Sequence, residues 1–273
     1  MRVFLEGHPM RLWYQSTLDF SEHRNYARSL AEHFRKIAGT GTEVILRGRA
    51  TDGAGSLSAA EIIGSSIVYR SVVDPAFVRA VFEAEALSAD AFIAASFSEP
   101  ILPELRSLAV MPVVSMSEAC FAAASASAPK IGLLTLNKDI VPYLEKSISL
   151  HKWKNRVSGI HLIEGGISET ELDAHYAHPS PFLDRLTRGV RTAATAGAQA
   201  VIVAEGVLGM MAAANGLTDV DGIPVIDAIA ATVLFARFLV DMKVSTGLMQ
   251  SRAAYPLPSA AARRLLAVRA AGS

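Results

Sequence analysis

The stretch AFIAASFSEP, residues 91–100, begins with five small or apolar residues and turns polar at Ser96. A short apolar run that ends in polar residues is typical of a buried strand whose end opens on a cleft. We therefore expect the side chain of Ser96 at the carboxyl end of this strand. The surrounding fold decides whether Ser96 takes part in chemistry or only ends the strand.

Other short apolar runs alternate with helical patterns along the chain. Further strands are expected over 2–6, 42–47, 112–115, 130–136, 157–163, 200–204 and 223–226. Helices are expected over 21–38, 75–87, 116–127, 138–151, 168–177, 180–196, 227–243 and within 257–271. Ser21 is the expected cap of the first helix, and Pro75 is the expected first residue of the second. Strands that are apolar throughout and separated by helices indicate a parallel sheet covered on both faces.

Two segments of the chain repeat the pattern of two earlier ones. AFIAAS (91–96) aligns without gaps on AVIVAE (200–205), and residues 111–124 align on 223–236 with a Pro-Val pair in each. Any two strand–helix units share apolar positions, but the Pro-Val pair at similar offsets favours a duplication. The sequence thus predicts an α/β fold of two pseudo-symmetric lobes, each a mostly parallel sheet flanked by helices.

The duplication also predicts where the lobes begin and where a ligand binds. We expect a first lobe of residues 1–115 with 227–243, a second of 116–226, and a C-terminal tail helix within 244–273. Ligands of open α/β sheets bind beyond the carboxyl ends of the strands. A ligand cleft is therefore expected between the lobes, with Ser96 and Glu205 approaching it from opposite sides.

Composition narrows the class of protein. Of 273 residues, 51% are hydrophobic, and 26 Lys and Arg balance 26 Asp and Glu, so no overall basic charge favours nucleic acid. The one cysteine, Cys120, cannot form an internal disulfide. No apolar run reaches the roughly 18 residues of a membrane span. A cytoplasmic protein is expected, and the mean hydropathy of +0.31 suggests a homo-oligomer.

Three segments carry a resemblance to a known family. These are DAFIAASFSEPILPELRSLAVMPVVSMSEA (90–119), AVIVAEGVLGMM (200–211) and KIGLLTLNKDIVPYLE (130–145). They resemble the aspartate/glutamate/hydantoin racemase superfamily, in particular its hydantoin-racemase-like branch. The resemblance implies two lobes, no cofactor, and one cysteine per lobe that removes or replaces a proton next to a carbonyl or carboxylate. It also implies that backbone N–H groups and hydroxyls after the strands hold the anionic end of the substrate.

The chain departs from this pattern at both cysteine positions, which match Ser96 and Val207. A thiol can be shifted into the thiolate range, whereas an unassisted serine hydroxyl is far too weak a base and valine cannot exchange a proton. Two-thiol racemisation is therefore excluded. Glu205 is a candidate general acid or base, and Ser96 is a candidate nucleophile or hydrogen-bond donor. The alternative for Glu205 is a carboxylate that caps the turn following it.

Residues near the expected strand ends are candidate substrate contacts: His8, Tyr14, Phe97, Ser98, Thr135, Gly206 and Val207. His8 lies where the family carries an Asn-Pro-Asn-Thr-like loop, and an imidazole there could move a proton near neutral pH. Thr135, with Asn137 and Lys138, opens the first strand-to-helix turn of the second lobe, where hydroxyl and N–H groups at a helix start suit a carboxylate.

Three other polar or reactive positions have simpler interpretations. Glu99 is expected to lie at a helix N-terminus, where a negative charge is favourable. His175 and His178 have a helical spacing but no evident third ligand, so surface histidines are favoured over a metal site. Cys120 is expected to be a buried, small apolar side chain.

The sequence leaves two functions open. One is a cofactor-independent enzyme acting on a small carboxylate, lactam or cyclic ureide by a Glu/Ser-based isomerase, lyase, decarboxylase or ring-opening hydrolase mechanism. The other is a non-catalytic protein that binds a small acid in the same cleft. The polar residues that remain at the strand ends favour the enzyme.

Overall fold

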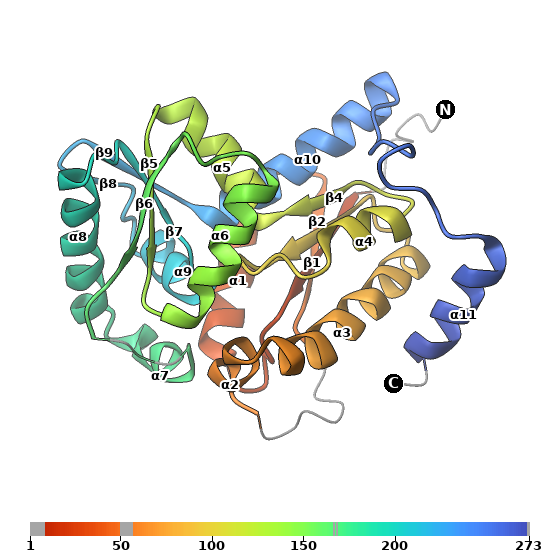
Figure 1. Ribbon diagram of the computed structural model, residues 1–273, viewed down its shortest axis with the longest axis horizontal. Coiled ribbons are helices and arrows are strands. Elements are labelled where there is room, and N and C mark those ends of the chain that lie inside the picture. Colours follow the sequence, from red (N-terminus) through yellow and green to blue (C-terminus); the bar gives the residue numbers. More distant parts are fainter. Residues whose placement is uncertain (1–8, 50–56, 166, 168, 272–273) are drawn as a thin grey trace.

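The computed structural model describes residues 9–49, 57–165, 167 and 169–271. His8 and the expected strand 2–6 lie outside the described residues. The rest of the chain forms two sheets with helices around them, the second sheet on the left of Figure 1 and the first on the right. In the described part of the chain no helix is long and apolar enough to cross a membrane.

The first sheet has the strand order β2-β1-β3-β4 and is parallel throughout. Its strands are β1 (Met10–Ser16), β2 (Thr42–Arg47), β3 (Ala91–Ala95) and β4 (Val113–Ser115). The helices among them are α1 (Arg24–Ile37), α2 (Ala59–Gly64), α3 (Ser66–Ala86) and α4 (Leu102–Leu108).

The second sheet has the order β6-β5-β7-β9-β8, with only β8 antiparallel to its neighbour. Its strands are β5 (Ile131–Thr135), β6 (Val157–Leu162), β7 (Ala200–Val203), β8 (Asp219–Val220) and β9 (Ile223–Ile226). The helices of this half are α5 (Met116–Ser127), η1 (Lys138–Ile140), α6 (Val141–Leu150), α7 (Glu169–Ala174), η2 (His175–Ala177), α8 (Ser180–Thr195) and α9 (Gly206–Ala214). Two helices, α10 (Ala228–Thr246) and α11 (Ala260–Ala271), complete the chain.

The two sheets repeat one topology. With the short β8 set aside, β1, β2, β3 and β4 of the first sheet occupy the places of β5, β6, β7 and β9 in the second. The segments that align in sequence, 91–96 with 200–205, are therefore β3 and β7, the equivalent strands of the two sheets. The predicted α/β fold of two similar lobes is confirmed.

The lobes are joined by an exchange of helices. Helix α5 follows the last strand of the first sheet and packs against β7 and β9 of the second. Helix α10 follows the second sheet and packs against β3 and β4 of the first, as well as against α5 (Figure 1). Helix α11 lies beside α3, away from the join between the lobes.

Strand β1 was not expected from the sequence. The first strand was expected over 2–6, with Tyr14 beyond it as a candidate substrate contact, whereas the structure has a strand over Met10–Ser16 that includes the polar residues Arg11 and Gln15. One of them, Gln15, is only 3% exposed, and its side chain accepts a bond from Trp13 Nε1 and donates to the carbonyl of Gly48. A polar residue with its bonds satisfied in this way is tolerated inside a buried strand.

Two helix starts also differ from the prediction. Helix α1 begins at Arg24 and not at Ser21, and the residue before it is His23, whose side chain makes no capping bond. Helix α3 begins at Ser66 and contains Pro75 in its interior. A proline inside a helix costs about 3 kcal/mol, but one face of α3 buries Tyr69, Val73 and Phe77, and that packing outweighs the lost hydrogen bond.

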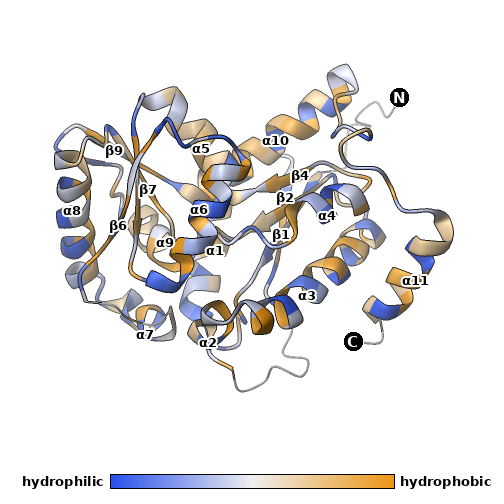
Figure 2. Cartoon of the chain, in the orientation of Figure 1, coloured by the Kyte–Doolittle hydropathy of each residue, from blue (hydrophilic) through white to orange (hydrophobic). Residues whose placement is uncertain are grey.

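The central strands of both sheets are buried. Every residue of β3, β5 and β7 is buried, and Figure 2 shows the strands of both lobes mostly in pale or orange shades, with blue on outer helices such as α8. Because these central strands are buried on both faces, they leave only their ends and the following loops to meet a ligand.

Candidate active site

A pocket lies where the carboxyl ends of strands from both sheets meet. The first lobe contributes the loop after β1, the end of β2, the end of β3, and parts of α1, α2 and α3, and the second lobe contributes residues after β5 and β7. The open space at its centre is about 80 Å³, well below the roughly 300–1,000 Å³ typical of pockets for drug-sized ligands. A small molecule is the ligand that fits this space.

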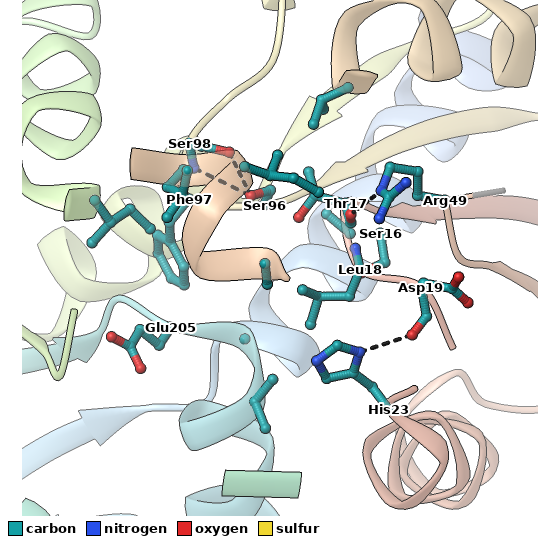
Figure 3. A pocket seen from close by; sticks show the side chains of 18 of the residues that line it. Ser16, Thr17, Leu18, Asp19, His23, Arg49, Ser96, Phe97, Ser98 and Glu205 are labelled. Carbon is teal, nitrogen blue, oxygen red and sulfur yellow. Dashed lines mark hydrogen bonds between the residues drawn. The ribbon is translucent and has the colours of Figure 1, made fainter. Parts of the chain in front are cut away.

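Ser96 reaches the pocket from the end of β3 as part of a chain of hydroxyl groups (Figure 3). Its Oγ lies 2.7 Å from Ser98 Oγ, which in turn lies 2.5 Å from the hydroxyl of Tyr69 on α3. Tyr69 is 5% exposed, and burial raises the pKa of its phenol above the usual value. The chain therefore consists of neutral hydroxyl groups, each able to donate one hydrogen bond and accept another.

Glu205 reaches the same pocket from the end of β7, but its carboxylate is held by the neighbouring turn. Oε1 accepts hydrogen bonds from Thr135 Oγ1 at 2.6 Å and from the backbone N–H groups of Leu136 and Asn137, both at 2.7 Å. In Figure 3 the carboxylate points away from Ser96 and His23. Three donors on one oxygen suit a carboxylate anion, so Glu205 occupies the anion-binding turn at Thr135 that was expected to hold a carboxylate of the substrate.

Glu205 does not cap its own helix. It is the residue before α9, yet its side chain makes no capping bond there. The alternative considered from sequence, a cap of the following turn, is wrong, because the carboxylate reaches across to the strand β5 instead.

His23 provides a second titratable group in the pocket. It is 1% exposed, and its Nδ1 lies 2.8 Å from the carbonyl oxygen of Asp19. A carbonyl can only accept, so Nδ1 carries the hydrogen, and in the neutral ring Nε2 carries a lone pair. Among the described residues Nε2 has no hydrogen-bond partner. A buried polar atom without a partner costs about 1–3 kcal/mol, and such an atom in a pocket points to a role with a ligand.

A cationic side chain also lines the pocket. Arg49 follows β2, is 8% exposed and donates from Nε to the carbonyl oxygen of Thr17 at 3.3 Å. The loop after β1 is itself fixed, because Leu18 N donates to Ser16 Oγ and Ser21 N donates to Asp19 Oδ1. This loop meets the pocket directly after β1, whereas His8 lies outside the described residues.

The remaining predicted site residues fall into two groups. Phe97, Ser98, Gly206 and Val207 all line the pocket. Thr135 is fully buried and contacts the site through Glu205. Tyr14 is fully buried in the core with its ring 5.0 Å from that of Phe34, and the structure does not place it at the pocket.

Three residues interpreted more simply from sequence have clear surroundings. Glu99 does not sit at the start of α4. Its carboxylate accepts from Ser115 Oγ and from His151 Nε2, the latter at 2.8 Å, and so links the loop after β3 to the end of α6. The Cys120 thiol is fully buried, and burial raises its pKa. His175 packs its ring 4.9 Å from Phe182.

In the ranges that the structure describes, no three His, Cys, Asp or Glu side chains converge as a metal ion would require. The polar groups that line the pocket include the imidazole of His23, the guanidinium of Arg49, the hydroxyl chain that ends at Ser96, and the carboxylates of Asp19, Glu22 and Glu205.

Comparison with known proteins identifies the family. The family model for Asp/Glu/Hydantoin racemase matches residues 25–236. The chain is 28% identical over 178 residues to a hydantoin racemase of Pseudomonas sp. strain NS671, covering 65% of this chain and 69% of that protein. It is 26% identical over 189 residues to a hydantoin racemase of Rhizobium meliloti, covering 69% of this chain and 75% of that protein.

Solved structures show the same fold. The allantoin racemase of Klebsiella pneumoniae has a TM-score of 0.72 at 18% identity, covering 92% of this chain and 94% of its own. That of Pseudomonas fluorescens has a TM-score of 0.71 at 21% identity, covering 92% and 97%. The fold and the pocket define a two-lobed α/β protein of the racemase type. The chain belongs to the Asp/Glu/hydantoin racemase family, which confirms the resemblance noted in its sequence.

Proposed function

We propose that this protein is a cofactor-independent isomerase that removes and returns a proton on a carbon next to a carbonyl group of a small substrate. The observation that carries the proposal is His23, a buried imidazole whose Nε2 has no partner among the described residues, in one pocket with Ser96. An imidazole is the side chain best suited to proton transfer near neutral pH.

His23 acts as the base in this proposal. The bond from Nδ1 to the Asp19 carbonyl fixes the ring orientation and leaves the lone pair on Nε2. Removing a proton next to a carbonyl moves negative charge onto the carbonyl oxygen. Ser96 and Arg49, both at the pocket wall, supply the donor and the positive charge that would stabilise that oxygen. The proton then returns to carbon, from the same face or from the other.

Glu205 takes a positioning role in this proposal, in place of the base predicted from sequence. Its Oε1 already accepts three hydrogen bonds that hold the turn after β5. Ser96 is proposed as a hydrogen-bond and proton donor and not as a nucleophile, because its side-chain partner is the hydroxyl group of Ser98, which continues to the hydroxyl group of Tyr69, and neither of these neutral groups is a base. Val207, in the second cysteine position of the family by resemblance, contributes only apolar surface.

The first choice of substrate is a cyclic ureide. The two relatives compared above are named hydantoin racemases, and the two solved structures compared above are named allantoin racemases. Small carboxylates and lactams are the further candidates, because the pocket combines a guanidinium with hydroxyl donors. A cytoplasmic location and a homo-oligomer remain predictions from the sequence.

The test is a proton NMR assay in D₂O with hydantoins substituted at carbon 5, allantoin, and a panel of small carboxylates and lactams. The proposal expects solvent deuterium at the carbon next to the carbonyl in at least one compound, with the skeleton unchanged. Ring opening or loss of carbon dioxide would instead indicate a hydrolase or a decarboxylase. Binding measured as a thermal shift, with no exchange in any compound, would contradict the proposal and support a non-catalytic binding protein.

A further inference from the structure

The hydroxyl chain that ends at Ser96 begins at a second cavity. Ser98 and Tyr69 line both the pocket described above and a neighbouring cavity of about 590 Å³. The distances along the chain are 2.5 Å from Tyr69 to Ser98 and 2.7 Å from Ser98 to Ser96. Three hydroxyl groups in continuous hydrogen-bond contact thus run from one cavity to the other.

The second cavity is suited to hold water. It lies between the two lobes, with walls from α3 and the loop after β3 on one side and from η1 and α6 on the other. Charged side chains of both signs line it: Arg70, Asp74, Glu99, Glu104, Lys138, Asp139 and Lys146. Four of these, Arg70, Glu104, Lys138 and Lys146, are exposed, so the cavity borders solvent.

We propose that Tyr69 and Ser98 form a proton relay that connects Ser96 to water in the second cavity. The proposal rests on the proposed function and adds to it the source of the second proton. Tyr69 and Ser98 act through Ser96 and are positioning residues, whereas Ser96 faces the reacting carbon.

Each proton that moves in the relay has a donor and an acceptor. His23 Nε2 takes the proton from one face of the carbon, and Ser96 gives its hydroxyl proton to the other face. As Ser96 gives its proton, it receives one from Ser98, which receives one from Tyr69, and Tyr69 receives one from water in the second cavity. The hydroxide left behind is neutralised by the proton that His23 returns to water. No hydroxyl group of the chain is left ionised.

This route does not use serine as a base, for which its hydroxyl group is far too weak, but as a proton donor. A lone serine hydroxyl is too poor an acid to give up a proton and remain an alkoxide. In the chain, each hydroxyl group receives a proton as it donates one, so no alkoxide forms. Burial raises the pKa of Tyr69, so its phenol stays protonated and can act as both donor and acceptor.

The test separates the two faces of the carbon. One enantiomer of a compound that the wild type exchanges is incubated in D₂O. Two rates are followed: exchange with retention, which needs only His23, and inversion with deuterium incorporation, which needs Ser96. The variants are Tyr69→Phe and Ser98→Ala. Tyr143→Phe is the matched control, because its ring lies 5.1 Å from that of Tyr69 and it lines the second cavity without belonging to the chain.

The relay predicts that both variants lose inversion by about 10-fold or more while exchange with retention continues. The ratio of the two rates then changes, which a purely structural defect would not cause, and Tyr143→Phe keeps the wild-type ratio. An unchanged ratio in Tyr69→Phe and Ser98→Ala would overturn the relay and leave the proposed function standing. A wild type that exchanges no proton in any compound would overturn both.

Discussion

Replacement of Glu205 separates the two roles that a carboxylate at this place can have. If Glu205 is a positioning residue, as we propose, its replacement mainly lowers the free energy of unfolding. If Glu205 is the general base, its replacement mainly lowers the reaction rate. The variants Glu205→Gln and Glu205→Ala give different results under the two hypotheses, because only the first keeps an acceptor oxygen.

The size of the effect follows from the contacts of Oε1. In Glu205→Ala, Leu136 N loses the acceptor that it has at 2.7 Å, whereas Asn137 N keeps Thr135 Oγ1 at 3.1 Å. One orphaned buried N–H costs about 1–3 kcal/mol, and the two weakened bonds add about 1 kcal/mol each. We therefore expect a loss of about 3–5 kcal/mol for Glu205→Ala and, since the amide oxygen still accepts, about 1–3 kcal/mol for Glu205→Gln.

The assay combines urea unfolding, followed by circular dichroism, with the deuterium exchange measured at 25 °C. For a chain of this size, each kcal/mol also lowers Tm by about 2–4 °C. The positioning role predicts that folded Glu205→Gln keeps exchange within about 10-fold of the wild type, short of the 10²–10⁴-fold worth of a general base. A Glu205→Gln variant that is as stable as the wild type but slower by about 10²-fold or more would refute the reasoning and restore Glu205 as the base.

Three further predictions concern residues around the pocket. The buried thiol of Cys120, whose pKa is raised, should react with a thiol reagent in urea but not in the native protein. Rapid labelling of the native protein with loss of activity would contradict a purely structural role for Cys120. A methyl group at Gly206 would lie 2.8 Å from the Tyr26 hydroxyl oxygen. Gly206→Ala should therefore lower the free energy of unfolding in urea by about 1–3 kcal/mol. An unfolding midpoint equal to that of the wild type would show that Tyr26 moves aside without cost. Asp173 accepts a hydrogen bond from Tyr26 N at 2.7 Å at the start of α1. Asp173→Ala should therefore lower the free energy of unfolding by about 0.5–2 kcal/mol and slow deuterium exchange, because His23 would be displaced. A loss of stability without slower exchange would show that Asp173 does not position His23.

The sequence predicted the two-lobed fold and its central strands β3 and β7. The strands β3 and β7 are wholly apolar and short, which predicts burial on both faces, and their alignment with each other predicts that Ser96 and Glu205 meet at one pocket. The same pattern failed for β1, because the buried polar residue Gln15 hides the apolar run and only the fold supplies the groups that bond it.

The chemistry of the site could not be read in the same way. His23 is identified as a candidate base only from the structure, because its Nδ1 lies at the Asp19 carbonyl and its Nε2 is buried without a partner among the described residues. No pattern in the sequence predicts either contact. The spacing of Ser96 and Ser98 is visible in the sequence, but their continuation to Tyr69 spans 29 residues and depends on how α3 packs. The Glu205 carboxylate lies 69 residues from the Leu136 amide that holds it.

The most direct test of the central claim compares two histidines on the same segment. His23 borders the pocket, whereas His33 is bound to Asp227 at 2.7 Å and does not line it. Deuterium exchange at the carbon next to the carbonyl should fall by about 10²-fold or more in folded His23→Gln and stay near the wild-type rate in His33→Gln. Equal exchange rates in the wild type and in folded His23→Gln would contradict the claim that His23 is the base of this enzyme.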